Sequence, residues 1–435
     1  MTSTAAASPP LVLLNAAYLS SSRDWRTPAG RDTSPFEVST FVREARQAEA
    51  AGVDVFFQAD FSGVQRASIR SGPPVNAFEP FQLAALVASA TDAIAVMPTV
   101  STLHTHPFTF ARNLASLDRI ARGRAWVNVV SSFRSGTGLG VTRTDRRGDR
   151  HAQTEEFVTL ARKLWRSWPP EALVADAASG TFVATELIED VGHQGEFYAH
   201  EGPIDMAPFS AAFPFTLQAT TSLAGLALAA RTADGVFAGT PTRRAAHLLR
   251  TVLQDEARAA GRPPDAVRLL PGAFLHLVDD RREAARLRRA RTGGTVDRAA
   301  AVLAFAQRHP RLDLTDLRPR APVPLDLVPP TPAETLATLG SAYLPVWDLV
   351  HGTEPAADLG DLAVRSAAWG EHAQFVGTVE EVLDELTEWI TGGAVDGFQL
   401  ILGNRFDLLT EEVVPTLKTL TTSPPQLISG GSRGA

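Results

Sequence analysis

The sequence of 435 residues contains no cysteine, and this absence excludes several kinds of chemistry. Disulfide bonds, thiolate nucleophiles, iron–sulfur clusters and cysteine-ligated zinc are all ruled out. Lysine is nearly absent too, with only Lys163 and Lys418, so almost every basic residue is arginine. In an alanine-rich chain we interpret this as genome composition rather than as an arginine-rich binding surface. The formal net charge of -7 also argues against a nucleic-acid or anionic-membrane partner.

Long hydrophobic runs are also missing. The apolar run Leu11–Leu14 is interrupted by Asn15, and no basic segment precedes it. It is too short for a signal peptide or a membrane span. We therefore expect a cytoplasmic protein with no membrane partner.

What the chain does contain is a regular alternation of short apolar runs with amphipathic segments. A helix is clearest where Phe157, Leu160, Ala161, Leu164 and Trp165 recur at helical spacing. The predicted strands are 11–14, 53–59, 94–98, 126–130, 215–219, 236–238, 269–277 and 398–402. Eight strand–helix pairs in strict alternation favour parallel strands that close on themselves. The sequence therefore predicts the α/β class, as a (β/α)8 TIM barrel.

Sequence signals also predict where two helices begin. Ser34-Pro35-Phe36-Glu37 has the form of a capping box, with Ser34 as the cap and Pro35 in the first turn. Thr378-Val379-Glu380-Glu381 is a second capping box, and its helix should end at Gly392-Gly393.

Three stretches do not fit the repeat: Ser132–Arg150, Pro169–Pro214 and Leu287–Val376. We interpret them as insertions at 132–150, 169–214 and 287–376 in one barrel domain that spans residues 1–435. Long loops of this kind usually have functional roles. Residues 421–435 are rich in serine, proline and glycine and are expected to form a disordered tail.

Polar residues occupy the positions where active sites form in such barrels, at the ends of strands. Asp60 and Thr99 end two predicted strands, Asn128 lies within a third, and Thr221-Ser222 follow a fourth. Ser222 also precedes a helix, whose first N–H groups could hold a phosphate. The alternative is that these residues cap helices or form turns. Asn128 interrupts an apolar strand, where an unpaired amide costs about 1–3 kcal/mol, so both interpretations stay open for it.

Three histidines, His104, His106 and His151, lie near these strand ends. Histidine can transfer protons near neutral pH, but His104 and His106 could equally be surface residues of a loop. No carboxylate lies at a ligand-like spacing from them, so we predict no metal site.

Several motifs occur in a specific order along nearly the whole chain. They include Glu79-Pro80-Phe81, Ala111–Asp118, Asn128–Ser131, Glu155-Glu156-Phe157, His193–Phe197, Gln218-Ala219, Ala233–Phe237 and Gly393–Phe398. In this order the sequence resembles the flavin-dependent monooxygenases of the bacterial-luciferase superfamily. Within it, the chain is most similar to the branch of nitrilotriacetate monooxygenase, dibenzothiophene-sulfone monooxygenase and pristinamycin IIA synthase.

The resemblance implies a two-component, FMNH2-dependent monooxygenase. Reduced FMN would come from a separate NAD(P)H:flavin reductase and react with O2 to give a flavin (hydro)peroxide. A small organic substrate would then be oxidised at or next to nitrogen or sulfur. The resemblance also implies a homodimer or higher homo-oligomer. Its FMN contacts fall on positions that match Asp60, Thr99, Asn128, His151, Thr221 and Ser222.

The chain departs from the family pattern at several of these places. Trp126-Val127-Asn128 replaces Gly-Trp-Asn, and Thr220-Thr221-Ser222 replaces Gly-Ser-Ser. Arg147 and His151 stand where the family has histidine and tyrosine, and His104 and His106 fall within its Tyr-Asn-Glu-Pro segment. His104, His106 and Arg147 are therefore the catalytic candidates. Three alternatives stay open: an F420-dependent oxidoreductase of the same fold, a flavin-free oxidase, and a non-catalytic relative.

Overall fold

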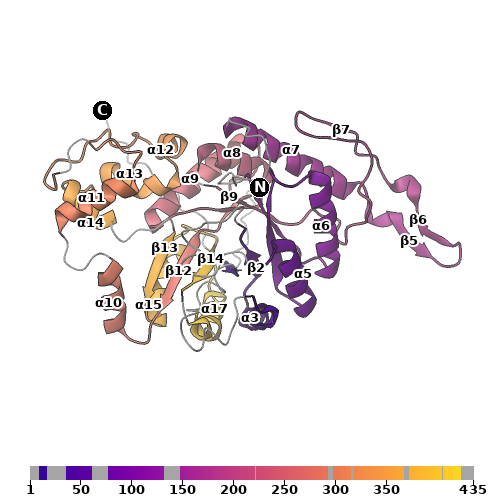
Figure 1. Ribbon diagram of the computed structural model, residues 1–435, viewed down its shortest axis with the longest axis horizontal. Helices are drawn as coiled ribbons and strands as arrows, with labels where there is room; N and C mark the ends of the chain where they lie inside the picture. The colour runs from indigo at the N-terminus through magenta and orange to yellow at the C-terminus, as the bar shows by residue number, and fades with distance from the viewer. Residues whose placement is uncertain are drawn as a thin grey trace, which may run out of the picture. The chain divides into compact units, whose positions relative to one another are not determined.

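The computed structural model describes residues 9–16, 36–60, 77–131, 147–220, 222–291, 297–314, 318–366, 372–403 and 405–422. The contacts divide the chain into two compact units. Unit 1 comprises residues 1–12, 238–254 and 268–435, and unit 2 comprises residues 13–237 and 255–267. Figure 1 shows the elements of both.

Unit 2 is built on parallel strands that lie side by side in the order β1, β2, β3, β4, β9 and β10. Their bounds are Leu11–Asn15, Val55–Gln58, Ala95–Ser101, Val127–Val130, Thr216–Ala219 and Gly235–Phe237. All six agree with predicted strands to within a few residues. The helices between them are α3 (Val38–Ala51), α5 (Pro80–Ala90), α6 (Pro107–Ile120), α7 (Arg147–Arg166) and α8 (Leu223–Thr232).

Helix α7 confirms the helical pattern read from the sequence. Its five apolar positions, from Phe157 to Trp165, are at most 1% exposed. Each of the large side chains contributes about 1.5–3 kcal/mol through burial and Ala161 less, so this one face accounts for much of the helix's stability. α7 packs between α6 and α8.

The strand register shows which side chains of unit 2 face inward. Phe57 on β2 and Phe237 on β10 have ring centroids 6.5 Å apart, although β3, β4 and β9 lie between their strands. Such an approach requires the sheet to curl, with both rings on the concave side. Register partners share a face of a parallel sheet, and the face recurs at every second residue. Thr99 and Asn128 lie opposite each other in register on this inner face.

Two antiparallel hairpins and two short 3₁₀ turns lie between α7 and β9. The first hairpin joins β5 (Leu173–Asp176) to β6 (Thr181–Val183) and is flanked by η1 (Pro170–Ala172) and η2 (Thr185–Leu187). The second joins β7 (His193–Gln194) to β8 (Ala199–His200). Both belong to the stretch 169–214 that departs from the barrel repeat.

Unit 1 contains three parallel strands in the order β13, β12 and β14. Their bounds are Ala373–Gly377, Gly272–Leu277 and Gly397–Leu402, and β11 (Arg268–Leu269) precedes β12. The remaining elements are α10 (Arg281–Arg291), α11 (Arg298–Arg308), α12 (Pro332–Thr338), η3 (Ser341–Tyr343), α13 (Leu344–His351), α14 (Leu359–Ser366), α15 (Val379–Thr391), α16 (Phe406–Leu408), the π-helix η4 (Leu409–Val413) and α17 (Val414–Leu417). Helix α9 (Arg243–Ala259) begins in unit 1 and ends in unit 2.

Helices α11, α13 and α14 share a hydrophobic cluster of their own. Val302, Phe305, Val346 and Leu362 are among its buried members and are at most 1% exposed. The prediction treated this part of the chain only as an insertion, and the structure adds that it has a separate apolar core.

Several boundaries differ from the sequence prediction. Helix α3 begins at Val38, and Glu37 is its N-cap through a hydrogen bond from the Ser39 N–H, so the predicted role of Glu37 inside a capping box was wrong. Ser34 and Pro35 lie outside the described residues. The predicted strand 269–277 is interrupted at Leu270-Pro271, because proline cannot donate to a ladder.

Strand β13 was missed, and α7 begins at Arg147, inside the first stretch assigned to an insertion. β13 is five residues long, and only Phe375 and Val376 supply a strong strand signal in it. The capping box at Thr378 is confirmed: its hydroxyl accepts from Glu381 N–H and the Glu381 carboxylate accepts from Thr378 N–H. α15 ends at Thr391 before Gly392, as predicted.

Candidate functional site

The inner face of unit 2 carries a buried polar pair on two neighbouring strands. The Thr99 hydroxyl donates to the Gln58 carbonyl at 2.7 Å, and the Asn128 Nδ2 donates to Thr99 Oγ1 at 2.9 Å. Thr99 is 4% exposed and Asn128 is 3% exposed. The structure therefore brings together two of the predicted site residues.

The Asn128 amide is only half satisfied. Its Oδ1 atom is buried and has no hydrogen-bond partner. Leaving a buried acceptor without a donor costs about 1–3 kcal/mol, so this oxygen is suited to a ligand that donates a hydrogen bond.

Two other buried amides provide a contrast. Gln58 Oε1 and Gln218 Oε1 also lack partners. In the register, however, Gln58 is paired with Pro98 and Gln218 with Val129, each one residue away from the inner-face positions. These two glutamines therefore lie on the outer face of the sheet, and of the three amides only Asn128 opens toward its concave side.

The remaining predicted contacts follow other strands. Asp60 is half-buried directly after β2. Ser222 is the N-cap of α8, and its hydroxyl accepts from Gly225 N–H at 3.2 Å. A Cβ at Gly225 would overlap the Thr220 hydroxyl, so this turn requires glycine. Thr221 lies outside the described residues. The Ser222 O–H and the first N–H groups of α8 can still donate to a ligand.

His151 is half-buried on α7, which packs against α8. The Arg162 guanidinium on α7 donates to the carbonyl of Thr232, the last residue of α8, at 2.8 Å. Burial lowers the pKa of His151, and Arg150 and Arg231 lower it further, so the ring is neutral near pH 7.

The two glutamates of the Glu-Glu-Phe motif have different partners. Glu155 forms a two-pronged ion pair with Arg231, with both distances 2.7 Å, which ties α7 to α8 at the surface. Glu156 instead points into the loop of the second hairpin, and its side chain is 13% exposed. It accepts from the N–H groups of Glu196, Phe197 and Tyr198 at 3.0, 2.9 and 2.8 Å.

A histidine and a glycine complete this arrangement. His193 Nε2 lies 3.1 Å from the Glu156 carboxylate, and Lys163 Nζ lies 3.4 Å from His193 Nδ1. A Cβ at Gly195 would overlap both the carboxylate and the His193 ring. Sequence reasoning used these residues only as a family resemblance and missed that they form one structural unit. A glutamate and a distant His-x-Gly are a signal that could have suggested their pairing.

The second hairpin holds the connection between β3 and α6. The Tyr198 hydroxyl lies 3.4 Å from the Thr102 carbonyl and 3.1 Å from Gln153 Nε2. The Tyr198 ring meets the His106 ring edge-on at 5.6 Å, and the Thr102 and Thr154 hydroxyls are 2.8 Å apart. This connection contains His104 and His106 and follows the strand that carries Thr99.

The two histidines of this connection are in different environments. His106 is exposed and is the N-cap of α6, with Nδ1 accepting from Phe108 N–H at 3.2 Å. Burial and the nearby His200 lower its pKa. His104 is half-buried, and both of its ring nitrogens are buried without a hydrogen-bond partner. His106 therefore caps helix α6, and of these two histidines only His104 has buried ring nitrogens without a hydrogen-bond partner.

Three further expectations concern Arg147, a metal site and a membrane span. α7 begins at Arg147, whose side chain lies outside the described residues. Within the described ranges, no group of three His, Asp or Glu residues could hold a metal ion. In the same ranges, no helix combines the length and apolar character needed to cross a bilayer.

Comparison with known proteins adds the family. The family model described as "Luciferase-like monooxygenase" matches residues 20–396. N-acetyl-S-(2-succino)cysteine monooxygenase of Bacillus subtilis (strain 168) is 28% identical over 406 residues, which cover 91% of this chain and 88% of the relative. Nitrilotriacetate monooxygenase component A of Aminobacter aminovorans is 26% identical over 389 residues, with 87% and 84% covered.

A solved structure supports the fold. Riboflavin lyase with modified FMN and riboflavin superimposes with a TM-score of 0.70 at 23% identity, covering 96% of this chain and 94% of that one. Together with the family match, this confirms the predicted α/β class and the luciferase-like TIM barrel.

Proposed function

The chain belongs to the luciferase-like monooxygenase family, and on that premise we propose that it is the oxygenase of a two-component system. It takes reduced FMN from a separate NAD(P)H-dependent reductase and uses O2 to oxidise a small organic substrate at or next to nitrogen or sulfur. That the chain is a monooxygenase, and so an oxidoreductase, follows from its family and its relatives.

The observation that carries the choice of cofactor is the unpaired Asn128 Oδ1 beside Thr99 on the inner face. The edge of a flavin ring has one N–H donor flanked by carbonyl acceptors. Asn128 Oδ1 would accept from that N–H, and Asp60 would support the site from the neighbouring strand. Because Asn128 is already fixed through its Nδ2 donor, its oxygen is held in place before the ring binds.

The phosphate of the mononucleotide would lie at the start of α8. There the Ser222 O–H and the N–H groups of Leu223 and Ala224 are donors, and a helix N-terminus favours negative charge. Thr221 would add a second hydroxyl. His151, on the neighbouring helix α7, would contribute a neutral ring N–H without adding charge.

Reduced flavin, when bound, supplies the two electrons with which one atom of O2 enters the substrate and the other leaves as water. The tasks of the protein are to bind, to orient and to exclude water. The Glu156-anchored hairpin and the Thr102–Thr154 contact keep the β3–α6 connection in place beside this site. His104, with unused ring nitrogens, is the residue there that we expect to contact the substrate.

The names of the relatives support the substrate class. One acts on a thioether that carries carboxylates, and the other acts on a tertiary amine that carries carboxylates. The designation "component A" of the second supports a separate reductase partner. We therefore propose a carboxylate-bearing amine or thioether as the substrate.

A coupled assay tests this function. The purified chain, a flavin reductase, NADH and FMN are incubated under 18O2 with nitrilotriacetate or N-acetyl-S-(2-succino)cysteine, and products are identified by mass spectrometry. We expect O2 uptake matched to product formation and one 18O atom in the oxidised product, which is reduced with borohydride before a carbonyl oxygen can exchange with water. Turnover with reduced F420 in place of FMN and without O2 would contradict the proposal.

Two amide variants give a matched control. Asn128→Ala should weaken binding of reduced FMN by about 5- to 100-fold, from a lost hydrogen bond of 1–3 kcal/mol. Gln218→Ala removes an equally buried amide from the outer face and should leave FMN affinity within about twofold. Equal effects of the two changes would remove Asn128 from the site.

A further inference from the structure

The first hairpin projects from the rest of unit 2 as an arm, defined here as residues 169–190. Figure 1 shows β5 and β6 extending away from α6 and α7, with only the short turns η1 and η2 of unit 2 drawn at the base of the ribbon. Every residue of β5 is exposed, and β6 has no buried residue. A two-stranded ribbon without a buried face is marginal in water. The formation of this ribbon therefore calls for a surface that covers it.

The arm exposes apolar side chains that such a surface would bury. Phe182 is 70% exposed, Val174 45%, Leu187 40% and Leu173 37%. Scattered single apolar residues need no explanation, but four within fifteen residues of one projecting element are a local concentration of exposed apolar side chains.

The arm is also acidic. No lysine or arginine occurs anywhere between Arg166 and Arg231. The acidic residues of the arm are all exposed: Glu171, Asp176, Glu186, Glu189 and Asp190. A second acidic arm would repel this one, so the surface that covers it must be basic.

Addition of a strand to the arm is disfavoured. Ala175, in the middle of β5, has a φ of 48°, and the pairing register shifts between Leu173 and Asp176. A bulge of this kind bends the strand and disrupts the row of N–H and C=O groups that another strand would need. Recognition of the arm must therefore rely on its side chains.

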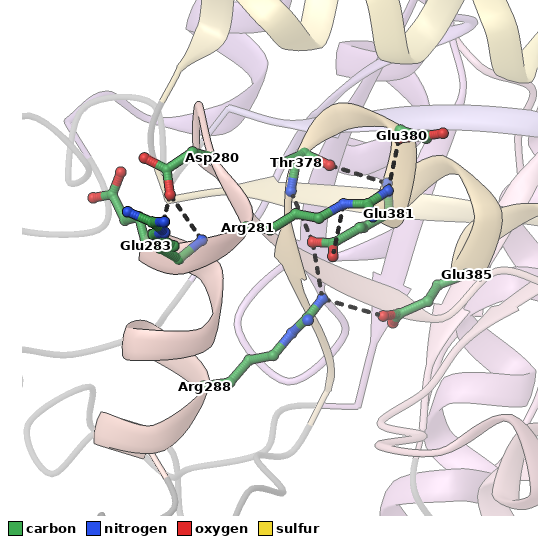
Figure 2. A network of polar contacts seen from close by, with 9 residues as sticks. Asp280, Arg281, Glu283, Arg288, Thr378, Glu380, Glu381 and Glu385 are labelled. Atoms are coloured by element: carbon green, nitrogen blue, oxygen red, sulfur yellow. Dashed lines mark hydrogen bonds and ion pairs between the residues drawn. The ribbon is translucent and has the colours of Figure 1, made fainter.

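The same chain carries a matching basic surface on α10. Residues 281–291 contain six arginines and one glutamate, the densest run of arginine in the sequence. In Figure 2, Arg281 and Arg288 point from α10 toward the acidic residues of α15. Arg281 pairs with Glu380 at 3.0 Å, and Arg288 lies 3.4 Å from Glu381 and 3.7 Å from Glu385.

A different face of α10 is left for a partner. Arg282 and Arg286 are exposed and one helical turn apart, and neither reaches α15. The Arg286 side chain is 75% exposed, and its ion pair is with Glu283 of its own helix at 3.6 Å. Arginine pairs with carboxylates and also stacks on aromatic rings, which suits both the acidic residues of the arm and Phe182.

We propose that the arm of one copy docks on the Arg282–Arg286 face of α10 of a second copy. Glu186 and Glu189 meet the two guanidinium groups, and Phe182 lies against them. A symmetric pair would contain this contact twice, because each copy has one arm and one α10. This proposal does not rest on the assignment of the cofactor, since neither surface includes a residue of the candidate site.

A charge-swap experiment on the full-length chain tests it. The first variant is Glu186→Arg with Glu189→Arg, and the second is Arg282→Glu with Arg286→Glu. Self-association is measured by analytical ultracentrifugation over a range of concentrations at low and high salt. We expect the wild type to self-associate and each variant to raise the dissociation constant at least about tenfold, from the loss of two cross-subunit charge pairs at each contact.

Combining the two charge variants tests whether the arm and α10 contact each other. A mixture of the two variants, or one chain that carries both sets, should associate again to within about threefold of the wild type. Phe182→Ser should weaken association, while Phe209→Ser, at an apolar residue 52% exposed outside the arm, should not. A monomeric wild type, unchanged association in either charge variant, or failure of the mixture to recover would overturn the proposal. Circular dichroism spectra of each variant verify that it is folded.

Discussion

Two clusters of glutamates in this molecule make similar numbers of contacts in opposite surroundings. Glu156 in unit 2 is 13% exposed and accepts from three backbone N–H groups and one histidine. The cluster on α15 in unit 1, drawn in Figure 2, relies on long arginine side chains, and Glu380 is 73% exposed. Exposed ion pairs contribute about 0–1 kcal/mol, whereas hydrogen bonds to a buried charge contribute about 1.5–3 kcal/mol each. The burial of a carboxylate and the type of its hydrogen-bond donors therefore affect stability more than the number of its partners does.

The largest expected effect comes from removing the Glu156 carboxylate. Glu156→Ala leaves three loop N–H groups without an acceptor, and we expect the free energy of unfolding to fall by about 3 kcal/mol. Glu155→Ala on the same helix breaks only the exposed pair with Arg231 and should cost less than about 1 kcal/mol. Urea denaturation measures both changes, and limited proteolysis at 193–198 reports loosening of the loop. Equal losses would show that burial does not separate the two glutamates.

The second largest effect is expected from a change in the loop that Glu156 contacts. Gly195→Ala places a Cβ against the Glu156 carboxylate, and overpacking of this kind costs about 1–3 kcal/mol. Gly202→Ala is the matched control, because a Cβ there meets nothing within 4 Å. Thermal unfolding of the two variants compares them. A Gly195→Ala protein as stable as Gly202→Ala would mean that the loop moves freely away from the carboxylate.

The charged forms of Glu156 and Glu385, one from each cluster, should change the free energy of unfolding in opposite directions. Burial raises the pKa of Glu156, but hydrogen bonds from Phe197, His193 and Tyr198 outweigh it, so the net pKa is lowered. Its stabilising contribution is therefore full above the unfolded pKa of about 4.3 and is lost as pH falls through the folded pKa. Burial raises the pKa of Glu385, and Glu381 and Glu388 add to this against Arg288.

Glutamine variants measure this difference. Glu156→Gln should destabilise the protein at pH 7, and the difference from the wild type should shrink as pH falls below about 4.3. Glu385→Gln should stabilise it at pH 7 and lose that advantage in acid, because a raised folded pKa makes the charged form less favourable in the folded state. Urea midpoints at several pH values record both trends. Parallel trends would contradict the assigned directions.

The smallest expected effect is in the exposed cluster itself. Glu380→Ala should change stability by less than about 0.5 kcal/mol, and added salt should remove the change. Glu381→Ala should cost about 1 kcal/mol and resist salt, because it also removes the capping box of α15. Denaturant titrations at two salt concentrations separate them. A salt-insensitive loss in Glu380→Ala would mean that this ion pair is worth more than its exposure suggests.

The sequence predicted the fold where pattern and local chemistry agree. The spacing of Phe157 to Trp165 and the capping box at Thr378 depend on neighbours a few residues apart, and both are confirmed. Strand β13 was missed because two apolar residues in five are too weak a signal. The start of α3 was misplaced because Glu37, which the pattern assigned to the first turn, is itself the N-cap and accepts from the Ser39 N–H group.

The candidate site was predictable only in part. Thr99 and Asn128 could be placed at strand ends, but that they bond to each other depends on a register between β3 and β4 that the sequence does not specify. The bond between Glu156 and the loop of residues 193–198 spans about forty residues and was invisible to local patterns. The roles of Asp60, His151 and Ser222 as cofactor contacts remain predictions, as does that of Thr221, which lies outside the described residues.

The most direct test of the proposed chemistry is an anaerobic titration of the purified chain with FMNH2, repeated with Asn128→Ala and Gln218→Ala. We predict saturable binding to the wild type and to Gln218→Ala, with a clear loss in Asn128→Ala. After O2 is admitted, the bound flavin should be reoxidised on a different time course from free FMNH2. Absence of FMNH2 binding to the wild type, or tight binding of reduced F420 in its place, would contradict the account.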